Sequence, residues 1–178
     1  MSDVLSGPLP THRVVIGLGA NLGDPQATLD QAIAFLKRNP ATTDWAVSPR
    51  YRSAPVGSDE AQPDYINAVA TCLTHLSPAE FMQWLLDVER QFGRDRSRDV
   101  VRNSARTLDL DLLLYDTEVI DTPLLVLPHP RLHQRAFVLR PLLDLLPDAE
   151  TLALGRLDRY LPNVADQVIE CLEGHNCS

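Results

Sequence analysis

An alternating run near the middle of the chain constrains the fold more than any other stretch. From Arg106 to Tyr115 the sequence reads RTLDLDLLLY, in which leucines at positions 108, 110, 112 and 114 alternate with Thr107, Asp109, Asp111 and Leu113. A period of two over this length predicts a β-strand with one fully apolar face. On the other face the two aspartates start about 6.6 Å apart. Their carboxylates can therefore converge on metal ions that lie about 3.5–4 Å apart in two-metal sites.

A solvent-facing edge strand is the plain alternative, because antiparallel strands often turn acidic residues outward. Aspartate is nevertheless depleted in strands, and two neighbouring like charges repel each other. The preceding segment favours a ligand-binding site over a solvent-facing strand. It carries five arginines between residues 94 and 106 beside only Asp95 and Asp99, although the net charge of the chain is -8. Metal ligands and positive charge together suit a magnesium polyphosphate, whereas a solvated basic loop or a nonspecific nucleic-acid patch is the alternative.

Length and composition indicate one globular domain. Of the 178 residues 44% are hydrophobic and 22% charged, and no apolar run reaches membrane-spanning length. We expect residues 1–12 to form a flexible leader without a signal pattern, and residues 13–178 to form a single domain. The acidic balance argues against a nucleic-acid partner. Cytosolic free thiols are expected for the three cysteines, which have no metal-binding spacing: Cys72, Cys171 and Cys177.

The first two thirds of the chain alternate strands and helices. Strands are expected at residues 13–18, 45–53, 65–73 and 106–115. A helix follows Asp24 with Pro25 at its first position, and a capping box from Ser77 to Glu80 starts a second helix that Gly93 ends. This order predicts a ferredoxin-like βαββαβ fold of class α+β, an antiparallel sheet with helices on one face.

The last third is expected to add a hairpin and two helices. The hairpin runs from Tyr115 through residues 116–117 into residues 119–120. Prolines keep Pro128-His129-Pro130 extended. Helices are predicted over residues 134–146, interrupted at Pro141, and over residues 162–172. The glycine-rich stretch at residues 17–23 lacks the third glycine of the dinucleotide fingerprint, and the absence of Gly-Lys-Ser/Thr excludes a P-loop.

Six short stretches occur in a characteristic order between residues 13 and 147. They are Gly17 to Gly23, Tyr51 to Pro55, Gln62 to Ala68, Glu89 with Gly93 and Arg94, Arg106 to Asp111, and Pro128 to Arg131 with Arg135 to Leu139. In these stretches the sequence resembles the hydroxymethyl-dihydropterin pyrophosphokinase family of folate biosynthesis. The resemblance implies transfer of the terminal pyrophosphoryl group of ATP to the hydroxymethyl oxygen of the dihydropterin, with release of AMP.

The resemblance also implies roles for individual residues. Asp109 and Asp111 would hold two Mg²⁺ ions, while Arg94 and Arg106 would stabilise charge in the transition state. The residues implied around the co-substrate ATP are Glu89, Arg94, Arg96, Arg102, Arg106, Leu112, His129 and Arg135. Those implied around the pterin are Ser53, Ala54, Pro55, Val56, Tyr65, Asn67 and Phe137. The chemistry agrees, because a flat heteroaromatic ring requires aromatic faces and amide hydrogen bonds.

We expect the loop from Arg94 to Arg106 to close over both substrates. Many family members have an aromatic residue before Gly-Pro-Arg, where this chain has Asn103-Ser104-Ala105. The expected protein is a monomeric cytoplasmic enzyme that acts on small molecules and binds neither nucleic acid nor membrane. The alternative is a ferredoxin-like module that binds nucleotide or RNA without catalysis. The intact Asp109 and Asp111, and the missing aromatic pattern of RNA-binding modules, argue against it.

Overall fold

An antiparallel sheet forms the centre of the molecule, for which the computed structural model describes residues 8–55, 61–93 and 108–173. Five strands follow one another across the sheet, and β2 pairs with the far end of β4. In sheet order the strands are β10 (Ile169–Cys171), β3 (Tyr51–Ser53), β4 (Tyr65–Thr74), β1 (His12–Ala20) and β5 (Asp109–Tyr115), with β2 spanning Thr42–Val47. This arrangement confirms the predicted βαββαβ order.

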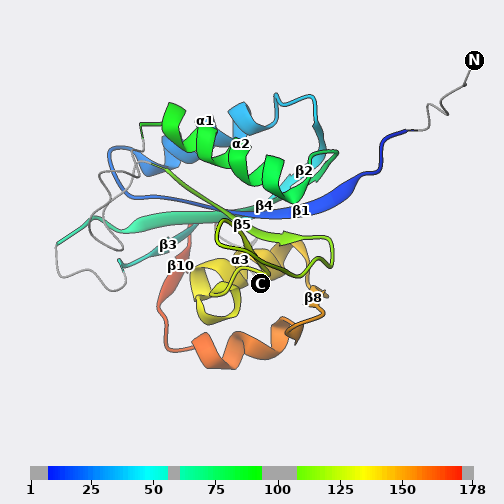
Figure 1. Cartoon of the computed structure of the whole chain (residues 1–178). Coiled ribbons are helices and arrows are strands. Elements are labelled where there is room, and N and C mark those ends of the chain that lie inside the picture. The colour runs from blue at the N-terminus through cyan, green and yellow to red at the C-terminus, as the bar shows by residue number, and fades with distance from the viewer. Residues whose placement is uncertain (1–7, 56–60, 94–107, 174–178) are drawn as a thin grey trace, which may run out of the picture.

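Helices cover both faces of the sheet (Figure 1). The helices α1 (Pro25–Leu36) and α2 (Pro78–Gln91) lie on one face, as the sequence predicted. The opposite face is covered by α3 (Ala136–Leu145) and two 3-10 segments, η1 (Leu132–Gln134) and η2 (Asp158–Val164). The sequence pattern had not indicated this second layer.

Both early helices start as predicted. The Asp24 side chain accepts a hydrogen bond from the Ala27 N–H (3.1 Å) ahead of α1. Ahead of α2, the Ser77 hydroxyl accepts from the Glu80 N–H (3.2 Å), and the Glu80 carboxylate accepts from the Ser77 N–H (2.8 Å). Gly93 follows α2 with φ of 85°, a left-handed conformation that glycine adopts readily. Residues 78–91 are therefore bounded by local signals at both ends.

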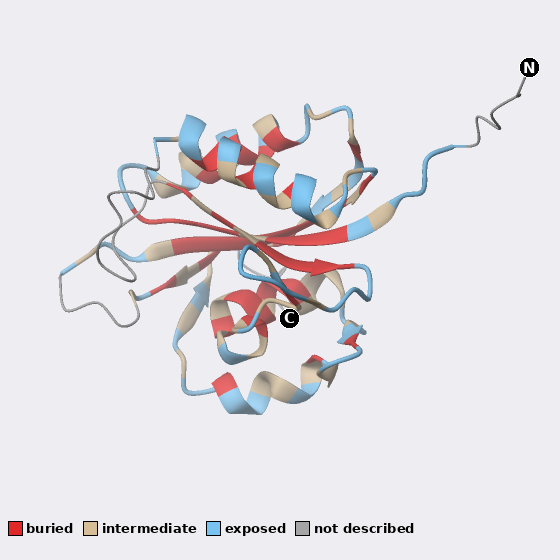
Figure 2. Cartoon of the chain, viewed as in Figure 1, coloured by how far each residue is buried: buried red, intermediate tan, exposed pale blue. Residues whose placement is uncertain are grey.

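Two hydrophobic cores share the sheet (Figure 2). The first lies between the sheet and the helices α1 and α2. It combines alternate strand residues with residues of the two helices: Ile16, Leu18, Leu110 and Leu112 from the strands, and Leu29, Phe81 and Leu85 from the helices. The second lies beneath α3 and includes Val15, Val69, Leu113, Leu139, Leu142 and Leu157. Because neighbouring residues of a strand point to opposite faces, β5 contributes to both cores. The described part of the alternating run thus has one buried face, while on its other face Leu113 is buried and Asp109 and Asp111 stay partly exposed.

The predicted strand at residues 45–53 is wrong in its extent, because it is two strands, β2 and β3. Pro49 lies between them and has no N–H to donate to the ladder. Ser48 bridges the break: its N–H donates to the Val69 carbonyl (2.8 Å), and its hydroxyl accepts from the Val69 N–H (2.9 Å). The edge of β4 therefore stays hydrogen-bonded across the interruption.

The predicted hairpin after β5 is also wrong. The strand β6 (Ile120–Asp121) pairs with β7 (Val126–Leu127) instead of with β5. Asp116 remains tied to β1, since its N–H donates to the Arg13 carbonyl (2.8 Å) and its carboxylate accepts from the Arg13 N–H (2.7 Å). Another small ribbon, β8 (Glu150–Thr151) with β9 (Gly155–Arg156), follows α3.

The end of the chain differs most from expectation. The helix predicted over residues 162–172 is wrong: η2 ends at Val164, and β10 then adds an edge strand beside β3. Strand pairing prevails over the amphipathic pattern because β3 offers an open edge to a β-branched segment. The helix α3 starts at Ala136 and passes through Pro141 without the predicted interruption.

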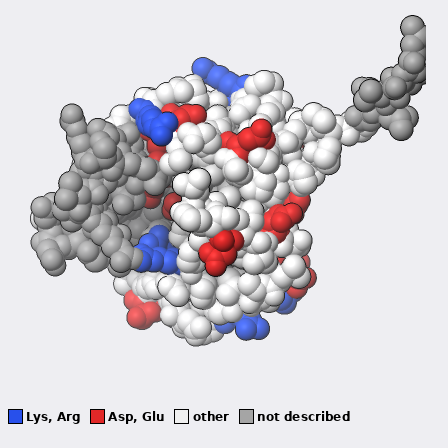
Figure 3. Space-filling view, viewed as in Figure 1, with Lys and Arg blue, Asp and Glu red and all other residues white. Residues whose placement is uncertain are grey.

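The cysteines also correct an expectation. Cys171 in β10 is disulfide-bonded, whereas Cys72 is a free, buried thiol. No helix in the described part of the chain combines the length and the hydropathy needed to span a membrane. Acidic and basic side chains are scattered over the described surface in the space-filling view, without a continuous basic area on that face (Figure 3).

Candidate active site

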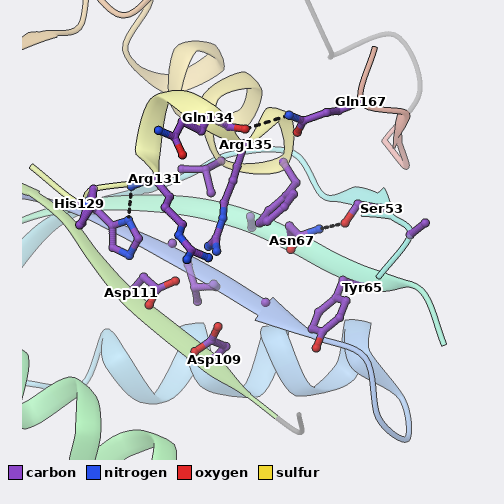
Figure 4. Close-up of a pocket in the computed structure, with 18 residues that line it drawn as sticks. Ser53, Tyr65, Asn67, Asp109, Asp111, His129, Arg131, Gln134, Arg135 and Gln167 are labelled. Carbon is purple, nitrogen blue, oxygen red and sulfur yellow. Dashed lines mark hydrogen bonds between the residues drawn. The ribbon is translucent and has the colours of Figure 1, made fainter. Parts of the chain in front are cut away.

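A cavity of about 810 Å³ lies between the sheet and the layer that contains α3 (Figure 4). Strands β1, β3, β4 and β5 form its floor and sides, and the segment from His129 to Val138 forms the opposite wall. The lining side chains that could take part in chemistry are Ser53, Tyr65, Asn67, Asp109, Asp111, His129, Arg131, Gln134, Arg135, Phe137 and Gln167.

Two glycines of β1 keep the floor of the cavity open. In the strand register Gly19 lies between Asp109 of β5 and Asn67 of β4, and Gly17 is paired with Asp111. Paired residues share a face of the sheet, so a side chain at either glycine would project into the cavity. A Cβ at Gly19 would lie 3.2 Å from the Asn67 Oδ1. The strand therefore leaves room between the carboxylates and the amide.

The acidic side of the cavity is formed by Asp109 and Asp111, which are partly exposed on one face of β5. Leu110 between them points the other way and is fully buried in the first core. Behind the strand Glu89 of α2, only 1% exposed, accepts a hydrogen bond from the Leu110 N–H (2.8 Å). Glu89 thus fixes the backbone between the two aspartates from the opposite face.

The basic side is formed by Arg131 and Arg135, whose side chains extend into the cavity from the wall opposite β5 (Figure 4). His129 lies beside them, and its backbone N–H donates to the Leu113 carbonyl of β5 (2.9 Å). Its Nδ1 accepts from the Arg131 N–H (3.2 Å). Burial lowers the pKa of His129 and the charge of Arg135 lowers it further, against the opposing effect of Asp109. A neutral imidazole therefore lies next to the two guanidinium groups.

The other end of the cavity has groups suited to a flat polar ring. Asn67 is 5% exposed, and its Nδ2 donates to the Ser53 hydroxyl (2.8 Å) and to the Tyr51 carbonyl (3.4 Å). These bonds fix the amide plane. Tyr65 and Phe137 supply aromatic surface at this end, and the guanidinium carbon of Arg135 lies 5.6 Å from the Phe137 ring centroid.

Most of the described residues that the sequence predicted for the site meet in this cavity. They are Ser53, Ala54, Tyr65, Asn67, Asp109, Asp111, His129, Arg135 and Phe137. Pro55 is described but does not line the cavity, and the side chains of Glu89 and Leu112 are buried in the layer beneath it. The remaining predicted residues lie outside the described residues, as does the predicted closing loop: Val56, Arg94, Arg96, Arg102 and Arg106.

The sequence reasoning missed several lining residues. Gly17 and Gly19 stood in a matching stretch but received no role, because their position opposite Asp111 and Asp109 depends on the strand register. Arg131 stood in a matching stretch but received no role. Gln167 gave no signal at all, because it falls in a segment that was predicted to be helical.

Comparisons with known proteins identify the family that this chain is similar to. The family model for 7,8-dihydro-6-hydroxymethylpterin-pyrophosphokinase (HPPK) matches residues 15–147. The 2-amino-4-hydroxy-6-hydroxymethyldihydropteridine pyrophosphokinase of Pseudomonas aeruginosa is 42% identical over 137 residues, which are 77% of this chain and 82% of that protein. The Bacillus subtilis protein of the same name is 39% identical over 135 residues, 76% of this chain and 78% of that protein.

Solved structures show the same fold. The crystal structure of an HPPK-DHPS protein in complex with substrates has a TM-score of 0.65 at 11% identity, over 86% of this chain and 43% of that one. The wild-type Plasmodium falciparum HPPK-DHPS with pterin and p-hydroxybenzoate has a TM-score of 0.62 at 13% identity, over 92% of this chain and 44% of that one. This chain spans less than half the length of either of these structures.

Proposed function

The chain belongs to the 7,8-dihydro-6-hydroxymethylpterin-pyrophosphokinase family, and on this premise we propose its reaction and the roles of its residues. It transfers pyrophosphate from ATP to the hydroxymethyl group of 6-hydroxymethyl-7,8-dihydropterin, and so gives AMP and the pterin diphosphate for folate synthesis. One observation supports this reaction best. A single cavity has paired carboxylates facing two arginines at one end, and a fixed amide with aromatic rings at the other.

We assign Mg²⁺ to Asp109 and Asp111, with two ions as the family resemblance implies. The residues fit this metal, because both carboxylates project from one strand face into an open cavity and supply the oxygen ligands that Mg²⁺ prefers. The described residues contain no group of three His, Cys, Asp or Glu that could hold a metal. Phosphate oxygens and water would therefore complete the coordination, as is usual for Mg²⁺. Bound there, the metal would neutralise phosphate oxygens of ATP.

The residues around the two aspartates would bind the triphosphate. Arg131 and Arg135 are placed to hold phosphate oxygens through their planar guanidinium groups. A neutral His129 can donate one further hydrogen bond from its Nε2, since its Nδ1 already accepts one. The sequence assigns Arg94 and Arg106 to the transition state, and we retain that assignment as part of the proposal.

The pterin would bind at the opposite end, with Asn67 and Ser53 meeting its polar edge and Tyr65 and Phe137 its faces. Its hydroxymethyl group then points toward the carboxylate end, where the β-phosphorus of ATP lies. Catalysis rests on bringing the hydroxymethyl oxygen into line with the β-phosphorus. This positional effect accounts for a large part of many enzymatic rate enhancements. The comparisons give no support to the alternative of a binding module without catalysis.

Chromatography of nucleotides tests the proposal directly. The protein is incubated with ATP, magnesium and 6-hydroxymethyl-7,8-dihydropterin, and AMP should form in step with the pterin diphosphate. An ordinary kinase transfers the γ-phosphoryl group and leaves ADP. Stoichiometric ADP, or AMP that forms equally well without the pterin, would contradict the pyrophosphokinase reaction.

We also propose that the enzyme is a monomer in the cytoplasm. The described residues of one chain bring the carboxylates, the arginines and the fixed amide together in one cavity, and ATP is abundant in the cytoplasm. The disulfide of Cys171 argues against the cytoplasm, because reducing compartments seldom retain disulfides. Light scattering measures the mass, and cell fractionation with counting of free thiols tests the compartment.

A further inference from the structure

Gln167 lies beyond the residues that the family model matches, yet its side chain lines the cavity. Its place in the chain is fixed on both sides. Its own N–H donates to the carbonyl of Val164 (3.0 Å), which is buried in the second core. Two residues later Ile169 pairs with Ser53, where β10 joins the sheet. The fold therefore holds Gln167 against the cavity wall.

The side-chain amide of Gln167 holds the backbone on both sides of Arg135. Its Nε2 donates to the carbonyl of Gln134 (2.8 Å; Figure 4), and its Oε1 accepts from the N–H of Ala136 (2.9 Å). Arg135 is the N-cap residue of α3, and it makes no side-chain capping bond. Gln167 thus supplies, from 31 residues away, the acceptor that the first turn of α3 lacks.

Arg135 depends on this support because little else orients it. In the described part of the chain its guanidinium forms no ion pair and lies against the Phe137 ring, 5.6 Å from the ring centroid. Fixing the peptide groups before and after a residue fixes the direction in which its side chain leaves the backbone. We infer that Gln167 is a positioning residue that directs Arg135 into the phosphate-binding end of the cavity, an inference that rests on the proposed function.

Two substitutions separate the hydrogen bonds from the volume of the side chain. Gln167→Ala removes both, while Gln167→Leu keeps a similar volume and removes only the hydrogen bonds. Val168→Ala, at the neighbouring and 87% exposed position, is the matched control. Each protein is titrated calorimetrically with a nonhydrolysable ATP analogue and magnesium, and its thermal unfolding is recorded. Both Gln167 variants should bind the analogue roughly fivefold to tenfold more weakly, whereas the control should match the wild type.

A double-mutant cycle then tests whether the effect passes through Arg135. Arg135→Ala should weaken analogue binding by itself, and adding Gln167→Ala should cause no further loss. Additive losses, or wild-type affinity in either Gln167 variant, would overturn the inference, as would a lowered melting temperature with unchanged affinity. A wild-type protein that binds no analogue would instead refute the proposed function, and the inference would fail with it.

Discussion

Replacing Gly19 by alanine should weaken pterin binding and leave the stability of the fold almost unchanged. A Cβ at this position lies 3.2 Å from the Asn67 Oδ1 and 3.9 Å from the Tyr65 ring. The Asn67 amide cannot rotate away freely, because its Nδ2 is held by the Ser53 hydroxyl and the Tyr51 carbonyl. The methyl group therefore displaces an amide that we assign to the pterin, and it also occupies the floor beside it.

The effect on stability is a near-cancellation of two terms. Alanine in place of glycine lowers the entropy of the unfolded chain and stabilises the fold by about 0.4–1 kcal/mol where the backbone allows it. A strained or lost hydrogen bond at Asn67 costs about 0.5–1.5 kcal/mol. The free energy of unfolding should thus change by less than about 1 kcal/mol. Loss of one bond to the pterin, about 1.4 kcal/mol, corresponds to roughly tenfold weaker binding.

Gly17→Ala provides the matched control on the same strand. The nearest atoms to a Cβ at Gly17 belong to the Leu113 side chain at 3.5–3.7 Å, which is ordinary van der Waals contact. This variant should therefore be more stable by about 0.4–1 kcal/mol and retain its pterin affinity. Calorimetric titration with the pterin alone, in the absence of ATP, measures the affinity, and chemical denaturation measures the stability. Equal pterin affinity in the two variants would refute the assignment of Asn67 and of the glycine floor.

Three further predictions concern the two aspartates of β5, the imidazole of His129 and the hydroxyl of Tyr51. Asp109→Asn and Asp111→Asn should each abolish AMP formation at saturating magnesium while the circular dichroism spectrum stays that of the wild type, and near-normal turnover in either would refute the metal assignment. The folded state lowers the pKa of His129 below 6.5, so the unfolded chain takes up a proton at this residue more readily than the folded protein does. The contribution of the neutral His129 to stability is therefore complete above pH 6.5, and it is lost as the pH falls through the pKa of the folded state. The stability of the wild type should thus decline more steeply than that of His129→Gln between pH 7 and pH 5, measured by denaturation without nucleotide or magnesium. Tyr51→Phe should cost about 1 kcal/mol of stability, because the Tyr51 hydroxyl donates to Asp144 of α3, and an unchanged denaturation midpoint would contradict that role.

The elements that the sequence predicted well are those with local signals. The capping box at Ser77 and the N-cap at Asp24 each satisfy backbone N–H groups within three residues, so no distant contact is needed to place them. The alternation of β5 was likewise sufficient to place Asp109 and Asp111 on one face. Local chemistry therefore predicted both the framework and the acidic side of the site.

The features that the sequence could not predict depend on partners far along the chain. The segment at residues 162–172 has an amphipathic helical pattern, but β3 presents an open edge to it, and β10 forms there instead. Gln167 lies just before β10, so its place at the cavity depends in part on that pairing. Arg131 is similar, because nothing in its neighbourhood indicates that the segment from His129 to Val138 folds over β5. Such positions follow from tertiary packing, which overrides local propensity.

The position of β5 at the edge of the sheet explains how the two aspartates are both accessible and held in place. An edge strand has backbone groups without a partner strand, which normally exposes it to unwanted pairing. Here Glu89 accepts from the Leu110 N–H, and the His129 N–H donates to the Leu113 carbonyl. Two residues that the family resemblance assigns to ATP therefore also bind the free side of the strand. Substituting Glu89 or His129 should shift Asp109 and Asp111 even where no contact with the nucleotide is lost. The resulting loss of activity would therefore combine a displaced pair of aspartates with weaker nucleotide binding.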